Sequence, residues 1–165
     1  MVNKFFLVLV LAVIASVGWW FLSSSEEARV KGTFKAMSAA IDKIGGEPPL
    51  KGLGKARNVV ALVEPGCMVE AFGKTIVLSS TVRDMTQQII AFRAMATNLH
   101  VSFEEVTVAF SDKTTAEVTC DFFYSGDDFG WSVRDARALE ATLRKDHESG
   151  RWRFVRVRLS NILEK

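Results

Sequence analysis

Cysteine, histidine and an excess of charge of one sign are all scarce in this sequence. It has two cysteines and two histidines in 165 residues, too few for a disulfide-rich scaffold or a zinc cluster of the usual spacing. Its 21 basic and 19 acidic side chains give a formal net charge of +2. Proteins that bind nucleic acid need a surplus of cations against the phosphates, so this balance argues against a nucleic-acid partner.

The sequence also lacks the motifs of nucleophilic and metal-assisted catalysis. It has no Gly-x-Ser-x-Gly elbow, and neither His100 nor His147 has a nucleophile close to it in the sequence. Asp127 and Asp128 are adjacent carboxylates without the further spaced oxygens of a calcium loop. We therefore predict no metal site and no cofactor.

One long apolar run lies at the amino terminus. The segment FFLVLVLAVIASVGWWFL, from Phe5 to Leu22, carries no charge over about 18 residues, close to the ~20 that cross ~30 Å of hydrocarbon. Lys4 precedes it and Glu26 and Glu27 follow it, which places the amino terminus in the cytoplasm by the positive-inside rule. The run predicts a single-pass membrane protein with an extracytoplasmic carboxy-terminal domain, periplasmic in a Gram-negative bacterium.

A cleaved signal peptide is the alternative for this segment. Ser23 and Ser25 are small residues that suit the positions before a cleavage site. Trp19, Trp20 and Phe21 argue against cleavage, because aromatic side chains at this point are typical of the edge of a membrane anchor. Both interpretations export the rest of the chain. Residues 1–25 are thus expected to be an anchor or uncleaved signal, and residues 26–165 to form one domain.

Helical periodicity dominates the first part of the exported chain. Ser24 and Glu27 form a capping box, and apolar residues then recur every three or four positions, at Val30, Phe34, Met37, Ile41 and Ile44. Gly45 and Gly46 end this predicted helix. A loop is expected over residues 50–54, followed by a shorter helix with Val59, Leu62 and Val63 on one face, which residues 64–66 end.

Strand periodicity dominates the second part. A hairpin is predicted within residues 67–78, with its turn around Gly73 and Lys74. Ser80 or Thr81 caps one more helix, which ends near residue 98 and buries an apolar face of Val82, Met85, Ile89, Phe92 and Ala96. Four antiparallel strands follow, with a bulge near Phe154, where the alternation of apolar residues changes phase.

This order of elements resembles the nuclear transport factor 2-like superfamily, which includes SnoaL-like proteins. The most similar stretches are ARNVVALVEPGCMVEAFG (residues 56–73) and SGRWRFVRVRLSNIL (residues 149–163). The resemblance covers about residues 26–165 and implies an α+β cone fold, in which a curved antiparallel sheet wraps on the N-terminal helices. It also implies either an isomerase, dehydratase, epoxide hydrolase or polyketide cyclase, or a binding or assembly module without activity.

Enzymes of this superfamily place polar side chains at the pocket end of the cone. Glu104 shares its phase with Val106, Val108 and Phe110, and Tyr124 shares its phase with Phe122, so both could point into one cavity as general base and oxyanion partner. The alternative is that both lie at strand ends in contact with water. The aromatic residues Tyr124, Phe122, Phe110 and Trp152 are the candidates for contact with a small apolar ligand.

The two cysteines and a group of arginines near the carboxy terminus are two further sets of candidate residues. Cys67 and Cys120 lie on predicted strands, where they are either buried thiols or, in an oxidising compartment, a disulfide. Arg151, Arg153, Arg156 and Arg158 form a basic stripe that could meet an acidic partner, lipid headgroups or cell-wall polymers. The alternative is a solvated outer sheet face that neighbours such as Glu140 and Asp146 neutralise in part.

These observations favour a membrane-anchored module that binds or assembles, without an evident catalytic constellation. The alternatives are a small-molecule isomerase, dehydratase or hydrolase that uses the cone pocket, and an assembly subunit that dimerises through its sheet. The expected partners are the membrane itself, through Phe5 to Leu22, and an envelope protein or a second copy of the chain.

Overall fold

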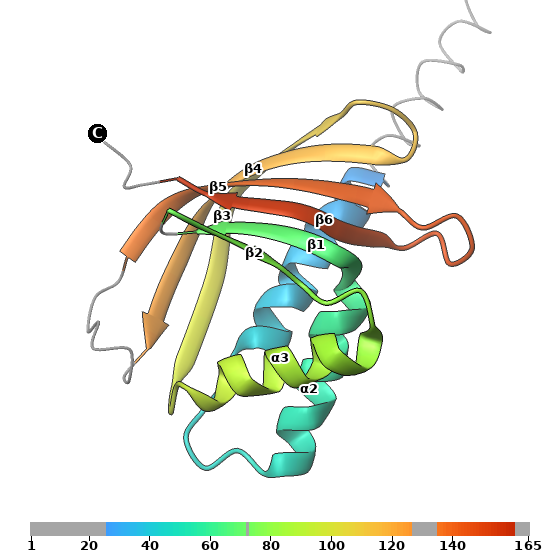
Figure 1. Ribbon diagram of the computed structural model, residues 1–165. Helices are drawn as coiled ribbons and strands as arrows, with labels where there is room; N and C mark the ends of the chain where they lie inside the picture. Colours follow the sequence, from blue (N-terminus) through green and yellow to red (C-terminus); the bar gives the residue numbers. More distant parts are fainter. Residues whose placement is uncertain (1–25, 72, 127–134, 161–165) are drawn as a thin grey trace, which may run out of the picture.

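The computed structural model describes residues 26–71, 73–126 and 135–160 (Figure 1). The anchor predicted for residues 1–25 therefore lies outside the described residues. Among the helices in the described part of the chain, none is long and apolar enough to cross a membrane.

Six strands form one curved sheet in the order β2-β1-β6-β5-β4-β3. They are β1 (Val63–Ala71), β2 (Lys74–Val77), β3 (Leu99–Phe110), β4 (Thr115–Gly126), β5 (Asp135–Lys145) and β6 (Trp152–Leu159). Neighbouring strands are antiparallel except β1 and β6, which are parallel. The sheet is thus mixed, and the expectation of a wholly antiparallel sheet was wrong at this pair. Alternation of apolar residues looks the same in both kinds of ladder, so it could not reveal the direction of pairing.

The three described helices lie on the concave side of this sheet (Figure 1). The first covers residues 26–41, and its buried residues Val30, Phe34 and Met37 follow the predicted spacing. The helix ends before Ile44, which is 75% exposed, so the prediction of Ile44 on its buried face was wrong. The chain leaves the helix because Lys43 pairs through its backbone with Leu99, at the start of β3. That long-range pairing has no local signal in the sequence.

The second helix, α2, spans Pro49–Leu62 and is longer than expected. It begins at Pro49, whose missing N–H costs nothing in a first helical turn, and continues through Gly52 and Gly54. The loop predicted over residues 50–54 was therefore wrong, because two glycines only lower the stability of a helix whose other face is buried. Residues 64–66, expected to form the stop, belong to the irregular first part of β1.

Several local predictions are confirmed. The β1–β2 hairpin pairs Ala71 with Lys74, which places Gly73, with its positive φ of 71°, in the turn. The third helix, α3 (Val82–Ala94), begins at Thr81, whose side chain accepts a hydrogen bond from the backbone N–H of Asp84. β6 has its bulge where the phase changes, because Phe154 pairs with Leu143 but Arg156 pairs with Thr142.

One apolar core fills the space between the sheet and the helices. Phe34 lies at its centre, with Phe103 at 5.2 Å and Phe154 at 4.9 Å between ring centroids, both edge to face. Met85 of α3 and Leu143 of β5 are 1% and 0% exposed in the same cluster. The concave side of the sheet is therefore occupied largely by the protein's own side chains.

Candidate functional site

The predicted pair Glu104 and Tyr124 is separated by a bulge in β3. Glu104 pairs with Asp121 and Thr107 with Thr119, so β3 carries one residue more than β4 between these two points. Glu105 has a positive φ of 51°, and the alternation of inward and outward side chains changes phase there. The expectation that Glu104 shares a face with Val106, Val108 and Phe110 was therefore wrong.

Tyr124 lies on the concave face, whereas Glu104 does not. Tyr124 pairs with Val101, which is 2% exposed, and it packs against the small cluster of Ala96, Leu99 and Val101. Glu104 is exposed and three positions along β3 from Val101, on the outer face. A hollow of about 360 Å³ lies there, lined by His100, Ser102, Glu104, Phe123, Tyr124 and Ser125. It brings the two predicted residues to one rim without aiming both into the cone.

The four predicted ligand-binding aromatics fall into two groups. Phe122 and Tyr124 lie near the end of the concave face beside Leu99, which we call the mouth. Phe110 and Trp152 contact each other, with ring centroids 5.8 Å apart, at the opposite end of the strands. Tyr124 lies eight positions along β4 from Ala116, the partner of Phe110, which is roughly 26 Å at ~3.3 Å per residue. One small ligand cannot contact both groups.

At the mouth, Tyr124 is accompanied by a residue that the sequence analysis did not identify as part of a site. Arg137 of β5 is 8% exposed and pairs with Phe122, on the concave face with Leu139. The signal for this position is its alternation with Leu139, Ala141 and Leu143 in the sequence. Burial raises the pKa of the Tyr124 hydroxyl. Gly126 leaves room for this hydroxyl, because an added Cβ would lie 2.7 Å from the Tyr124 hydroxyl oxygen and the ring would have to shift.

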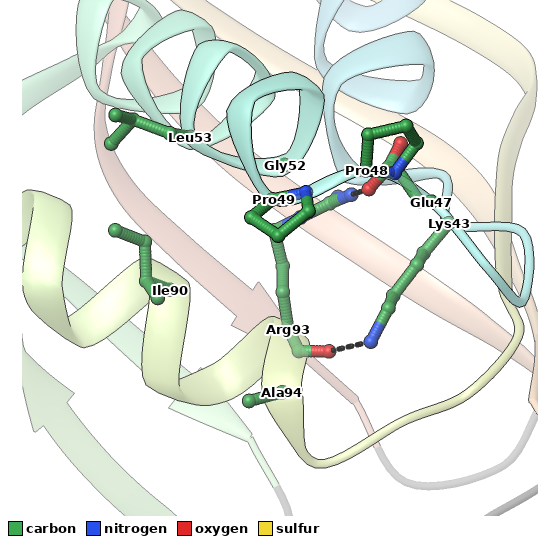
Figure 2. A pocket seen from close by; sticks show the side chains of 9 residues that line it. All are labelled: Lys43, Glu47, Pro48, Pro49, Gly52, Leu53, Ile90, Arg93 and Ala94. Atoms are coloured by element: carbon green, nitrogen blue, oxygen red, sulfur yellow. Dashed lines mark hydrogen bonds and ion pairs between the residues drawn. The ribbon is translucent and has the colours of Figure 1, made fainter.

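A second hollow, the α2–α3 cleft, opens between the start of α2 and the end of α3 (Figure 2). It measures about 220 Å³ and is lined by Lys43, Glu47, Pro48, Pro49, Gly52, Leu53, Ile90, Arg93 and Ala94. Leu53 and Ile90 lie toward one end, while the side chains of Lys43 and Arg93 lie toward the other. The cleft is thus apolar on one side and charged on the other.

Arg93 is the central charged residue of the cleft, with 5% of its side chain exposed. Its guanidinium donates hydrogen bonds to the backbone carbonyls of Ala40 and Ile41, at the end of the helix over residues 26–41. It also forms an ion pair of 2.6 Å with Glu47. Arg93 therefore satisfies helix-terminal carbonyls that would otherwise lack partners, and Glu47 balances its charge.

Lys43 caps the end of α3 in the same way. Its ammonium donates to the carbonyl of Arg93 at 2.8 Å and to that of Ala96 at 2.5 Å, where α3 ends. Each helix is thus capped by a cation from the other segment, which we call the reciprocal cap. Both cations lie at the negative end of a helix dipole. These side chains hold the fold together, and their charges are already satisfied.

Glu47 completes this arrangement. Its carboxylate is 5% exposed and also pairs with Lys55 of α2 at 2.8 Å. Burial alone would raise the pKa of Glu47, but the hydrogen bonds from Lys55 and Arg93 outweigh it and hold that pKa below 4.5. A carboxylate that stays ionised between two cations is a poor general base near neutral pH. Sequence reasoning missed this role, although Arg93 follows Met85 and Ile89 at helical spacing.

The predicted face of α3 changes accordingly. Met85 and Ala96 are buried as expected, whereas Val82 is 62% and Phe92 46% exposed. The helix turns Arg93 inward in place of Phe92, because Arg93 finds carbonyl and carboxylate partners there. The prediction that Val82 and Phe92 belong to the buried face was wrong.

The four arginines of the predicted stripe lie in or next to β6, and most have acidic partners. Arg156 and Arg158 donate to the two carboxylate oxygens of Glu70 at 2.6 and 2.9 Å. Arg158 also lies 3.7 Å from Glu140, and Arg153 lies 3.5 Å from Asp146. Arg151 is exposed beside the turn before β6. Glu70 could not be found from sequence because it reaches the stripe through the parallel β1–β6 pairing.

Cys67 and Cys120 are free, buried thiols. Burial raises the pKa of Cys67 to about 11 and that of Cys120 to about 12. No disulfide joins them, so the disulfide alternative is not realised in this structure. In the described part of the chain, no group of three or more Cys, His, Asp or Glu side chains is arranged to hold a metal ion.

Comparison of the whole architecture with solved structures identifies the fold. A proposed dehydratase of the NTF2-like family from Streptomyces avermitilis superposes with a TM-score of 0.65 at 13% identity, covering 86% of this chain and 99% of that one. The domain has the NTF2-like fold. An NTF2-like protein from Cytophaga hutchinsonii gives a TM-score of 0.59 at 11% identity, covering 81% of this chain and 95% of the other.

A proposed ketosteroid isomerase from Shewanella frigidimarina shares the NTF2-like fold as well, with a TM-score of 0.56, 18% identity and coverage of 78% of this chain and 92% of the other. No family model matches the sequence, and no curated protein matches it. Identities this low establish a shared fold alone, so the function must be argued from the site.

Proposed function

We propose that this chain is a membrane-anchored, extracytoplasmic binding module that contacts an envelope protein and performs no catalysis of its own. The observation that carries the proposal is the filled cone. Phe34, Phe103 and Phe154 occupy the centre of the concave face, where an enzyme of this shape would need an enclosed space for its substrate.

The polar side chains support the same conclusion. The polar side chains on the concave face of the strands include Tyr124, Arg137 and Lys145, and none of these three is a carboxylate or an imidazole. The buried charges of the α2–α3 cleft belong to the reciprocal cap and are satisfied by helix ends. Acid–base catalysis needs a proton acceptor poised near the working pH, which these groups do not supply.

The rim of the α2–α3 cleft is the surface we assign to the partner. Ile44, Leu50 and Met95 each follow a lining residue in the chain and are 75%, 83% and 62% exposed. Ile90, within the lining, is 40% exposed. Large apolar side chains gathered around one hollow are typical of a protein-binding surface. Lys51 and Arg57 of α2 are exposed nearby and favour a partner segment that combines apolar and acidic residues.

Site-specific photocrosslinking in intact membranes tests the proposal. The photoreactive residue p-benzoylphenylalanine is placed in the full chain at Leu50 or Met95, and at Thr119 as a control. Thr119 is exposed on the outer face of β4. We expect the same adduct mass from Leu50 and Met95 and none from Thr119. An adduct from Thr119 alone would instead support assembly through the sheet, and adducts from none of the three would refute the module.

A small-molecule enzyme is the second candidate. Two of the solved structures with this fold are named as a proposed dehydratase and a proposed ketosteroid isomerase. In this chain such an activity would use the mouth, where Tyr124 and Arg137 lie. Native mass spectrometry of the full chain decides between the candidates. A stoichiometric small molecule that Tyr124→Phe releases, without loss of stability, would favour the enzyme.

A further inference from the structure

The first turn of the helix over residues 26–41 is fastened to a distant part of the sheet. The carboxylate of Glu26 accepts hydrogen bonds from the indole N–H of Trp152 at 2.9 Å and from the ammonium of Lys145 at 3.0 Å. Arg29, one turn on, donates to the backbone carbonyl of Gly150 at 2.9 Å. We call these contacts the hairpin clamp, because Lys145, Gly150 and Trp152 belong to the β5–β6 hairpin.

The hairpin clamp fixes the orientation of the helix relative to the β5–β6 hairpin as well as the distance between them. Trp152 is 3% exposed, so packing holds its indole in place and the indole in turn fixes the position of Glu26. Glu26 and Arg29 also pair with each other at 2.9 Å, which ties both contacts into one unit. The start of the helix and the turn of the hairpin therefore move together as one rigid piece.

Only a short stretch of chain separates the apolar run from the hairpin clamp. The apolar run predicted to span the membrane ends at Leu22, and only Ser23, Ser24 and Ser25 separate it from Glu26. Even when fully extended, this connection spans at most about 14 Å at ~3.5 Å per residue. The headgroup region on one side of a bilayer is itself roughly 5–8 Å thick. The clamped end of the domain must lie close to the bilayer that holds the run.

The surface at this end suits a headgroup layer. Phe110 is 39% exposed and contacts Trp152, and aromatic side chains are favoured at the membrane–water interface. In the hairpin turn, Asp146 accepts bonds from the backbone N–H groups of Glu148 and Ser149. His147, Glu148 and Arg151 are exposed around it. Such a mixture of charges matches zwitterionic phospholipid, which offers both phosphate and ammonium groups.

We infer that the β5–β6 turn, residues 146–151, lies against the phospholipid headgroups of the membrane that carries residues 5–22, and that the α2–α3 cleft faces away from it. The helix over residues 26–41 sets the separation, about 24 Å at ~1.5 Å per residue. This inference rests on the anchor in the proposed function. It assigns the two ends of the domain to two different neighbours, lipid at the clamp and protein at the cleft.

Fluorescence quenching by spin-labelled lipid tests the orientation. The full chain is reconstituted into phosphatidylcholine vesicles containing a nitroxide on the headgroup, after labelling of a single new cysteine. His147→Cys reports on the hairpin turn, and Lys51→Cys, exposed at the start of α2, is its matched control. Cys67 and Cys120 are 2% and 5% exposed, so the dye reacts with the introduced thiol.

We expect strong quenching at residue 147 and little at residue 51. Equal quenching at both positions, or stronger quenching at residue 51, would overturn the orientation. Flotation with the vesicles at alkaline pH tests the anchor separately from the orientation. A chain that does not float refutes the anchor and the orientation together. A chain that floats without quenching at residue 147 refutes the orientation alone.

A pair of variants examines the hairpin clamp directly. Glu26→Gln removes the charge that holds Lys145 and Trp152, and it should reduce the difference in quenching between residues 147 and 51 at least twofold. Glu27→Gln is the control, because Glu27 pairs with Lys31 of its own helix at 2.6 Å. Flotation should be unchanged in both. An identical quenching difference in the two variants would show that the clamp does not orient the domain.

Discussion

The helix over residues 26–41 is held at its two ends in contrasting ways. At its start, the Glu26 side chain is 27% exposed and contacts an indole and an ammonium across the hairpin clamp. At its end, Arg93 and Glu47 form an ion pair in which each side chain is 5% exposed, and Arg93 caps the helix carbonyls. Water can replace the partner of a partly exposed side chain, whereas it cannot replace the partner of a buried one. The comparison therefore predicts unequal costs for breaking the two ends.

Arg93→Ala should have the largest effect of the variants considered. It leaves the Glu47 carboxylate short of a buried partner and orphans the carbonyls of Ala40 and Ile41. We expect the free energy of unfolding to fall by about 3–5 kcal/mol, measured by urea denaturation. Arg83→Ala, at an exposed position on the same helix, is the control and should change little. A loss below ~1 kcal/mol for Arg93→Ala would mean that water replaces the guanidinium.

Lys43→Met should have the next largest effect. The ammonium donates to the carbonyl of Arg93 in the last turn of α3 and to that of Ala96 just beyond it, and charged hydrogen bonds of this kind contribute about 1.5–3 kcal/mol. We expect a loss of ~2 kcal/mol in the same denaturation experiment, together with faster amide hydrogen exchange in the last turn of α3. Lys51→Met provides the comparison at an exposed site on α2. Equal effects of the two variants would contradict the reciprocal cap.

Glu26→Gln should cost less than either of these changes. The amide still accepts a hydrogen bond from Trp152 but loses its charge toward Lys145 and Arg29. We expect a loss of ~1 kcal/mol, checked by thermal unfolding. If Glu26→Gln destabilises the protein as much as Arg93→Ala does, the contrast between the two ends of the helix is wrong.

Acid titration should show the smallest effect, and it examines the carboxylates at the two ends of the helix. Burial alone would raise the pKa of Glu26, but hydrogen bonds from Lys145, Trp152 and Arg29 outweigh it and hold that pKa below 4.5. The pKa of Glu47 is also lowered. Both carboxylates bind protons more readily in the unfolded chain, so their contribution is complete well above pH 4.5 and is lost as the pH falls through the folded-state pKa values.

Unfolding midpoints between pH 7 and pH 3 measure this loss. The wild type should lose stability below about pH 4.5, and Glu26→Gln should lose less of it, because one of the two titrating contributions has been removed. An equal or steeper loss in Glu26→Gln would mean that Glu26 does not contribute to the acid sensitivity.

Local features were predictable from sequence, and long-range ones were not. Thr81 and Asp84 lie three residues apart at a helix start, and the phase change at Phe154 marks a bulge, so each signal is contained in a short stretch. The bulge at Glu105 gave no such signal, because neither glycine nor proline marks it and the alternation can be followed through it in the wrong phase. That error alone misplaced Glu104.

The cleft was missed for a related reason. A cation at helical spacing, such as Arg93, fits either a solvated face or a buried one until its partners are known. Those partners lie some 50 residues earlier, in Ala40, Ile41 and Glu47. Sequence periodicity reports which face is apolar, but it cannot report which distant carbonyls and carboxylates meet an inward cation.

The parallel pairing of β1 with β6 has a consequence for how the domain is completed during synthesis. β6 is the last of the described strands in chain order, yet it lies in the interior of the sheet, between β1 and β5. Until residues 152–159 have been made, the β1–β2 hairpin has no neighbour to join on its inner side. The inner edge of the hairpin therefore stays unpaired until the last described strand is made, and the sheet closes in a late step.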